Sequence, residues 1–147
     1  MGTTYKSTQV TAGSGIPPRA LHAGLFAIVG DLNLANPGAA LVVTDVVQMV
    51  KVPKGFTVHD LILDCPDIDS ATNLTLSVGD GDSTARYISA SAIGQTGGIA
   101  RLAVAGGTLK QYAAEDTIDI LVAAGPATAQ AGTIRLTVIG SMDAVPE

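Results

Sequence analysis

The chain has 147 residues and a formal net charge of −5, which fits one domain with an acidic surface. Hydrophobic residues make up 47% of it, yet it has no Trp, two Phe and three Tyr, so Val, Ile, Leu and Ala must build the core. The charge argues against a nucleic-acid-binding protein, which normally carries a basic face. Cys65 is the only cysteine, which excludes an intramolecular disulfide. No apolar run approaches the ~20 residues that cross a bilayer, so we expect no membrane partner and no cleaved signal peptide.

Residues 1–19, MGTTYKSTQVTAGSGIPPR, are predicted to form an extended N-terminal arm. The segment is rich in Thr, Ser and Gly, and its closing proline pair breaks any helix. Two interpretations stay open: a frayed terminus, or an arm that lies on a neighbouring subunit. In the second, the candidate partner-binding residues are Tyr5, Lys6, Pro17, Pro18 and Arg19.

Residues 20–142 are predicted to form a β-domain, followed by a C-terminal tail at 143–147. Turn signals recur about every ten residues, which is typical of an all-β sandwich or barrel of about eight to ten short strands. Two one-turn helical candidates lie near Ser89–Ala92 and Tyr112–Glu115. The strand candidates in chain order are LHAGLFAIV, LVVTDVVQMVKV (one long strand or two short ones), FTVHDLILD, LTLSV, ARYIS, RLAVA, TLKQYA, AAEDTIDILVA and TIRLTVIG.

Two local features of these strands are specific enough to test. In FTVHDLILD the inward-facing parity changes between Val58 and Leu61, which predicts a β-bulge near His59-Asp60. The glycine pair between RLAVA and TLKQYA predicts a two-residue hairpin turn at Gly106-Gly107.

The stretch LTLSVGDGDSTARYIS allows three interpretations: a dinucleotide-binding loop, a calcium loop or a turn between strands. The dinucleotide motif fails because Thr84 stands where the third glycine belongs and no helical pattern follows. An EF-hand fails because Ala85 and Ser91 occupy the positions of its glycine and its final carboxylate. A turn that joins two strands is therefore the favoured interpretation.

A looser calcium site stays open as an alternative. It would require two acidic loops to meet at one end of the sandwich, since carboxylate oxygens are the ligands that this cation takes. The competing explanation is that Asp side chains in turns bond neighbouring backbone N–H groups. The candidate ligands are Asp64, Asp67, Asp69, Asp80 and Asp82.

Catalytic constellations are not recognisable in the sequence. The G-x-S-x-G motif is absent, and His59 and Asp60, as strand neighbours, point to opposite faces. One Cys and two scattered His, His22 and His59, are too few for a zinc site. We therefore expect a protein that is not an enzyme and uses no cofactor.

Three stretches resemble small head proteins of tailed bacteriophages. They are VVQMVKVPKGFTVHDLILD, DSATNLTLSVGDGDSTARYISAS and YAAEDTIDILVAAGPATAQAGTIRLTVIGSM, and together they cover about Val46 to Met142. The resemblance is to capsid decoration, or cement, proteins. It implies a jelly-roll-like β-sandwich, a homotrimer, and a position on the outer surface of the head, bound to the major capsid protein. It also implies synthesis in the host cytoplasm.

Three functional hypotheses follow. The first is a structural virion protein that decorates the head and stabilises the shell. The second is a tail or spike component with the same fold, and the third is a calcium- or glycan-binding β-sandwich. The location of the protein in virions separates the first two, and a calcium-dependent rise in melting temperature identifies the third.

Overall fold

The computed structural model describes residues 2–7, 24–34 and 41–142. Within these ranges the chain forms ten strands and one short 3-10 turn, which confirms the all-β expectation. The elements are β1 (Thr4–Lys6), β2 (Phe26–Leu34), β3 (Val46–Val52), β4 (Phe56–Cys65), β5 (Thr75–Gly79), β6 (Ile88–Ser91), η3 (Ile93–Gln95), β7 (Gly98–Arg101), β8 (Lys110–Gln111), β9 (Asp116–Ala124) and β10 (Gly132–Met142).

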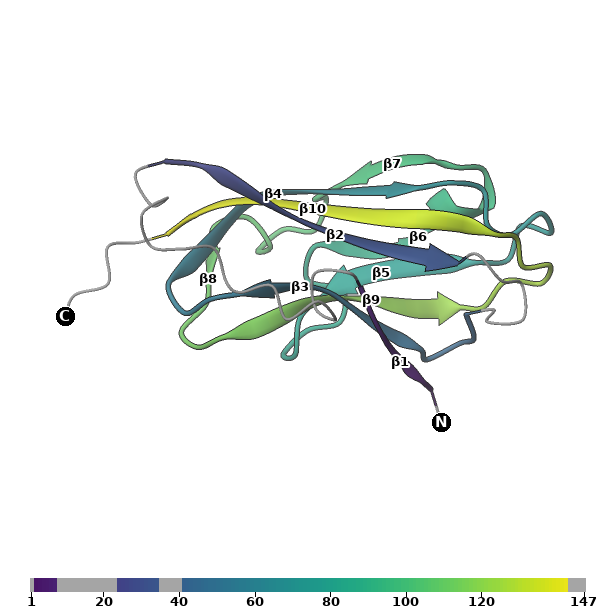
Figure 1. The fold of residues 1–147 in the computed structure, drawn as a ribbon, viewed down its shortest axis with the longest axis horizontal. Helices are drawn as coiled ribbons and strands as arrows, with labels where there is room; N and C mark the ends of the chain where they lie inside the picture. Colours follow the sequence, from purple (N-terminus) through teal and green to yellow (C-terminus); the bar gives the residue numbers. More distant parts are fainter. Residues whose placement is uncertain (1, 8–23, 35–40, 143–147) are drawn as a thin grey trace.

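The strands form two layers, a jelly-roll-like sandwich (Figure 1). Sheet A has the strand order β1-β3-β9-β5-β6, and sheet B has the order β2-β10-β4-β7, with β8 also pairing with β4. All pairs are antiparallel except β1 with β3, which run parallel. Sequence neighbours are often separated in the sheets, so most pairings join distant segments of the chain.

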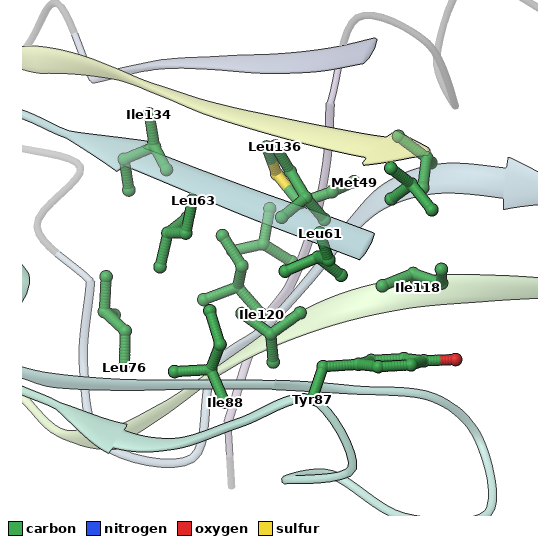
Figure 2. Close-up of a cluster of buried hydrophobic side chains, with 14 of the residues drawn as sticks. Met49, Leu61, Leu63, Leu76, Tyr87, Ile88, Ile118, Ile120, Ile134 and Leu136 are labelled. Atoms are coloured by element: carbon green, nitrogen blue, oxygen red, sulfur yellow. The ribbon is translucent and has the colours of Figure 1, made fainter. Parts of the chain in front are cut away.

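The core lies between the sheets and is almost entirely aliphatic, as the composition requires. Alternate residues of β9 and β10 point inward, because successive side chains of a strand face opposite sides of a sheet. The fully buried side chains include Met49, Leu61, Leu63, Leu76, Ile118, Ile120, Ile134 and Leu136. Figure 2 shows them meeting between the layers, together with the ring of Tyr87, whose hydroxyl points away from the aliphatic cluster.

The predicted bulge in β4 is confirmed. Residue Ile139 of β10 pairs with Asp60, but the next residue, Gly140, pairs with Val58, so His59 is the extra residue. The bulge changes the parity of β4 and lets both of its ends direct apolar side chains into the core.

The predicted turn after β5 is also confirmed. β5 and β6 pair antiparallel, with Val78 opposite Ile88, and the polar stretch between them is a connection. A strand follows it where a dinucleotide-binding loop needs a helix.

The predicted hairpin at Gly106-Gly107 is wrong. β7 pairs with Ile62–Cys65 and β8 pairs with Thr57–Val58, so both lie along β4 and not along each other. The segment between them crosses to the other sheet, where the N–H groups of Ala103 and Val104 donate to the Tyr87 carbonyl at 3.0 and 3.2 Å. The ten-residue edge of β4 offers each segment a partner, and the bulge separates the two pairings.

Neither helical candidate forms a helix. Ser89 and its neighbours belong to β6, and the short 3-10 turn begins only at Ile93. Tyr112 instead follows β8, and its N–H donates to the Phe56 carbonyl at 2.9 Å. The 41–52 candidate forms one strand, β3, which begins at Val46 because Thr44 adopts a positive φ of 73°.

Candidate functional site

The N-terminal segment is docked on the edge of β3. In the parallel ladder Thr4 lies opposite Val46 and Lys6 lies opposite Gln48. Hydrogen bonds extend the ladder at both ends: the Val46 N–H donates to the Thr3 carbonyl at 3.1 Å, and the Ser7 N–H donates to the Gln48 carbonyl at 2.8 Å. β1 therefore covers part of an edge that would otherwise present unpaired backbone groups.

Asp45 anchors the beginning of this segment. Its side chain is completely buried, and it accepts hydrogen bonds from the Thr3 N–H at 2.5 Å and the Val42 N–H at 2.8 Å. Gly2 packs so closely that an added Cβ would lie 2.1 Å from the Thr44 carbonyl oxygen. The site therefore fits a residue without a side chain at position 2, followed by a residue whose N–H donates to Asp45. In this way the edge of β3 recognises a particular segment.

Ser7 anchors the other end. Its N–H extends the ladder, and its hydroxyl donates to the Met49 carbonyl. Sequence reasoning missed both anchors, Asp45 and Ser7, because their roles depend on pairing between residues about forty positions apart.

The predicted arm is only partly described by the structure. Tyr5 is half-buried and packs against the core, while Lys6 is exposed on β1. Within the predicted arm, Thr4–Lys6 form a strand of sheet A that pairs with β3. Pro17, Pro18 and Arg19 lie outside the described residues, so their proposed partner contacts stay a prediction.

Asp69 organises one end of the sandwich. Its buried carboxylate accepts five backbone N–H groups, from Leu74, Asn73, Thr128, Ala127 and Ala71, at 2.7 to 3.2 Å. Burial raises the pKa of this carboxyl, but the N–H donors lower it more, so its pKa lies well below the ordinary range. The aspartate thus joins the loop before β5 to the loop after β9.

Asp80 organises the opposite end. Its Oδ2 accepts from the Arg86 Nε at 2.6 Å and from the Tyr112 hydroxyl at 3.1 Å, while its Oδ1 accepts from the Ser83 N–H at 2.9 Å. The Tyr87 and Tyr112 hydroxyls lie 2.6 Å apart. Burial raises the pKa of Asp80, but its hydrogen bond to Arg86 and the other donors outweigh burial and lower it. Asp80 is therefore a buried, ionised and paired group.

The two acidic loops do not meet, so the proposed shared calcium site is wrong in its geometry. Asp69 bonds the residue just before β5 and Asp80 follows its last residue, so the five-residue strand holds them about 17 Å apart. Asp64 is exposed on β4 beside β10, Asp67 lies in the loop of Asp69, and Asp82 lies in the turn of Asp80. No group of three or more acidic, His or Cys side chains that could hold a metal ion occurs among residues 2–7, 24–34 and 41–142.

Asp119 has a half-buried carboxyl group with a raised pKa. It lies on β9 between the inward-facing Ile118 and Ile120, and so projects from the outer face of sheet A. Its Oδ1 is buried and has no hydrogen-bond partner. Burial raises its pKa to about 6: a hydrogen bond with Thr117 lowers the pKa in part, and the negative charges of Asp116 and Asp80 raise it further. Nearby, an open hollow of about 440 Å³ is lined by Gly81, Asp82 and residues 110–116.

The contacts of His59 and the burial of Cys65 indicate structural roles for both residues. The Nε2 of His59 lies 2.9 Å from the Ser141 Oγ, so this histidine joins the bulge of β4 to the end of β10. Cys65 is completely buried, and burial raises the pKa of its thiol to about 12. His22 lies outside the described residues.

The outer face of sheet B combines apolar residues with paired charges. Val29, Thr137 and Ile62 form one row across β2, β10 and β4, and Val29 is 45% exposed. In the next row, Arg135 makes two hydrogen bonds to Asp31, at 2.8 and 3.0 Å. On the other side of the row that contains Val29, Thr137 and Ile62, Asp60 forms an ion pair with Arg101. Most charges on this face are therefore paired, on a chain that is acidic as a whole.

No helix in the described part of the chain has the length and apolar character that a membrane span requires.

Comparisons with known proteins give structural relatives only. No protein-family model and no curated protein matches the chain. Its fold is similar to that of a chain in the capsid of Ralstonia phage GP4, with 24% identity and a TM-score of 0.82 over 96% of this chain and 99% of that one. A chain of the cyanophage Pam1 capsid asymmetric unit is 26% identical, with a TM-score of 0.73 over 88% and 92%. A chain of the acid-stable capsid of Helicobacter pylori bacteriophage KHP30 is 13% identical, with a TM-score of 0.53 over 82% and 89%. The fold is thus shared with chains of phage capsids, which supports a capsid-related protein.

Proposed function

We propose that this chain is a structural protein of a phage virion that decorates the outside of the head and stabilises the shell. The observation that carries the proposal is the likeness to the GP4 and Pam1 capsid chains. The likeness extends over most of this chain and most of each matched chain, so the matched chains have about the same length and architecture as this one. The resemblance of residues 46–142 to decoration proteins favours this role over a shell-forming one.

The surface of the chain suits a role in binding without catalysis. Two of the five carboxylates that sequence analysis singled out are used internally: Asp69 ties two loops together, and Asp80 is paired with Arg86. These contacts hold the loops at both ends of the sandwich. A small domain that adds contact area between shell subunits stabilises whichever shell state it binds, by mass action.

Co-sedimentation tests the proposal directly. Purified protein is titrated onto phage heads that lack it, and the bound copies per head are counted at saturation. We expect saturable binding at a fixed copy number and a higher temperature of head disruption when the sites are full. Absence of binding well above micromolar concentration would refute a decoration role.

The same preparation separates the other candidates. Antibody labelling of intact virions shows whether the protein lies on the head or on a tail or spike. A calcium titration of the melting temperature tests the ion-binding alternative, for which the separated acidic loops give no shared site. The size of the free protein in solution tests the expected trimer.

The arm is tested by deletion of residues 2–18. We expect weaker binding to heads, because the arm is proposed to contact the shell or a neighbouring subunit. Since β1 also belongs to sheet A, thermal unfolding of the variant must be followed in parallel. A deletion variant that unfolds normally and binds heads with unchanged affinity would remove the arm from the binding site.

A further inference from the structure

We propose that Thr117 and Gln48 form an internal ester cross-link, in which the Thr117 hydroxyl attacks the side-chain amide of Gln48, ammonia leaves, and Asp119 transfers the proton. The cross-link joins β3 to β9, which are neighbours in sheet A (Figure 1). It is a reaction of the chain with itself and needs no external substrate, cofactor or partner. The inference goes beyond the decoration role and does not depend on it.

The three reacting groups lie together on the outer face of sheet A. Gln48 of β3 is directly opposite Asp119 of β9, and its Nε2 lies 3.5 Å from the Thr117 Oγ1. The Thr117 hydroxyl also hydrogen-bonds the Asp119 carboxyl, which stands two residues along the same face of β9. A nucleophile, an amide and an acid are therefore mutual neighbours, which is the arrangement that acyl transfer requires.

A bulge in β3 aims Gln48 at Thr117. The pairing of β3 with β9 shifts between Gln48 and Val50, so Met49 is an extra residue. Met49 and Val50 are both buried, which shows that the alternation of the strand changes at this point. A β-bulge bends its strand and redirects neighbouring side chains. The Gln48 amide thus reaches its diagonal neighbour Thr117 across the ladder.

The surroundings of Asp119 suit it to proton transfer. In the described part of the chain no group hydrogen-bonds its buried Oδ1, and burial raises its pKa to about 6, so the carboxyl carries a proton in mildly acidic solution. A neutral carboxylic acid can give a proton to a leaving nitrogen, and its carboxylate can take one from a hydroxyl. The charged groups on this face or close to it are Lys6 of β1, Lys51 of β3, Asp116 of β9 and Asp80 after β5.

The loop after β5 shields one side of the site from water. Gly79, the β5 partner of Asp119, packs against this loop so closely that an added Cβ would lie 1.9 Å from the Ser83 carbonyl oxygen. Gln48, Thr117 and Asp119 are accordingly half-buried although they point outward. Partial exclusion of water favours the protonated acid and protects an ester from hydrolysis.

The atoms of the reaction balance without an oxidant or a reductant. The Thr117 Oγ1 forms a bond to the Gln48 Cδ, which is bonded to Nε2 and therefore lies within about 5 Å of the hydroxyl. A rotation of the Gln48 side chain shortens this separation to the ~3.3 Å of a near-attack geometry. The Asp119 acid protonates Nε2, the Cδ–Nε2 bond breaks, and the hydroxyl proton passes to the Asp119 carboxylate. The products are one ester and one ammonia molecule.

The mass of the intact protein tests the reaction. Freshly purified chain is incubated at pH 5 and at pH 8, and its mass is followed with time. We expect a loss equal to the mass of one ammonia molecule, at least tenfold faster at pH 5, because Asp119 is protonated there. A mass that stays at the sequence value, or a rate of loss that does not depend on pH, would overturn the proposal.

Peptide mapping identifies the two ends of the cross-link. Trypsin yields peptides 20–51 and 111–135, which contain Gln48 and Thr117 and should appear as one joined species. Hydroxylamine, which cleaves esters and leaves amides intact, should separate them. Loss of ammonia within a single peptide would come from another reaction and would contradict the cross-link.

Substitutions separate the roles of the three residues. Thr117→Val removes the hydroxyl and Gln48→Met removes the amide, so both should abolish the mass loss, whereas Thr117→Ser should keep it. Asp119→Asn should slow the loss at least tenfold and remove the difference between pH 5 and pH 8. Thermal unfolding verifies that each variant is folded, and the result on the unaltered chain stands without them. A mass loss that persists in folded Thr117→Val or Gln48→Met would refute the assignment.

The chain contains a matched contact that lacks a protonated acid. The Gln130 Nε2 lies 3.4 Å from the Ser70 Oγ, but this pair is exposed, and the neighbouring Asp69 carboxyl has a lowered pKa and accepts backbone N–H groups. Peptides 55–86 and 111–135, which contain these two residues, should therefore stay separate under the same conditions. If they join as fast as peptides 20–51 and 111–135, contact alone suffices and Asp119 has no part in the reaction.

Discussion

Replacing Asp119 by Asn should stabilise the protein at neutral pH. The ionised carboxylate lies half-buried on sheet A with one oxygen unpaired, and Asp116 and Asp80 add negative charge nearby. Asparagine keeps the shape of the side chain and removes the charge. The variant therefore removes an unfavourable interaction without opening a cavity.

The raised pKa of Asp119 sets the magnitude and the sign. A rise from 3.8 to about 6 corresponds to an upper limit of about 3 kcal/mol, and solvent screening of a partly exposed group reduces this to about 1 kcal/mol. Because the folded-state pKa is raised, the protonated group favours the folded state below pH 3.8, and this contribution is lost as the pH rises through about 6. The advantage of Asp119→Asn should therefore be near 1 kcal/mol at pH 7.5, or about 3 °C in Tm, and should shrink toward zero near pH 4.

Urea unfolding at pH 4, 5, 6 and 7.5 measures this difference. Circular dichroism follows the sheets, and tyrosine fluorescence follows the buried Tyr87 and Tyr112. Glu115→Gln, which removes an exposed negative charge just before β9, is the matched control and should show no comparable pH-dependent gain. The reasoning is refuted if Asp119→Asn is neutral or destabilising at pH 7.5, or if its gain is the same at every pH.

Three further substitutions test the packing. Arg86→Ala should destabilise the fold by about 2 kcal/mol in urea unfolding because it leaves Asp80 buried without its ionic partner. Since the folded-state pKa of Asp80 is lowered, that loss should be full above pH 4 and should diminish as the pH falls below it. Leu136→Ala should cost about 3 kcal/mol by opening a cavity between the sheets, and a loss under 1 kcal/mol would contradict its central place in the core. Gly30→Ala should cost about 2 kcal/mol, because its Cβ would stand 2.1 Å from a carbonyl oxygen of β3, whereas Gly24→Ala, with open space around it, should change the Tm little.

Local sequence patterns determined the class of the fold and several of its details. TIDILVA and TIRLTVIG were both expected to be strands, and their alternate apolar residues face inward in β9 and β10, because the period of two is a local property of a strand. The parity change in FTVHDLILD located the bulge at His59 for the same reason. The absence of a third glycine and of a following helical pattern removed the dinucleotide interpretation of Gly79–Asp82.

Only the tertiary structure decided which strands pair and which polar groups meet. The Gly106-Gly107 hairpin failed because β7 and β8 both found a longer edge on β4, a competition that no local pattern records. The two acidic loops have similar sequences, but β5 separates Asp69 and Asp80 to opposite ends of the sandwich. There Asp69 accepts backbone N–H groups, and Asp80 accepts from Arg86.

The docking of the N-terminal segment on β3 shows the same division between what the sequence and the tertiary structure determine. The sequence marked an N-terminal segment distinct from the domain, since its composition and its proline pair are local features. It could not show that Asp45 and Ser7 anchor this segment on β3, because a parallel pairing between residues about forty positions apart is fixed only when the two sheets have closed around one core. Asp45 is buried at this point of the fold, and its carboxylate accepts the Thr3 N–H, so it recognises the strand.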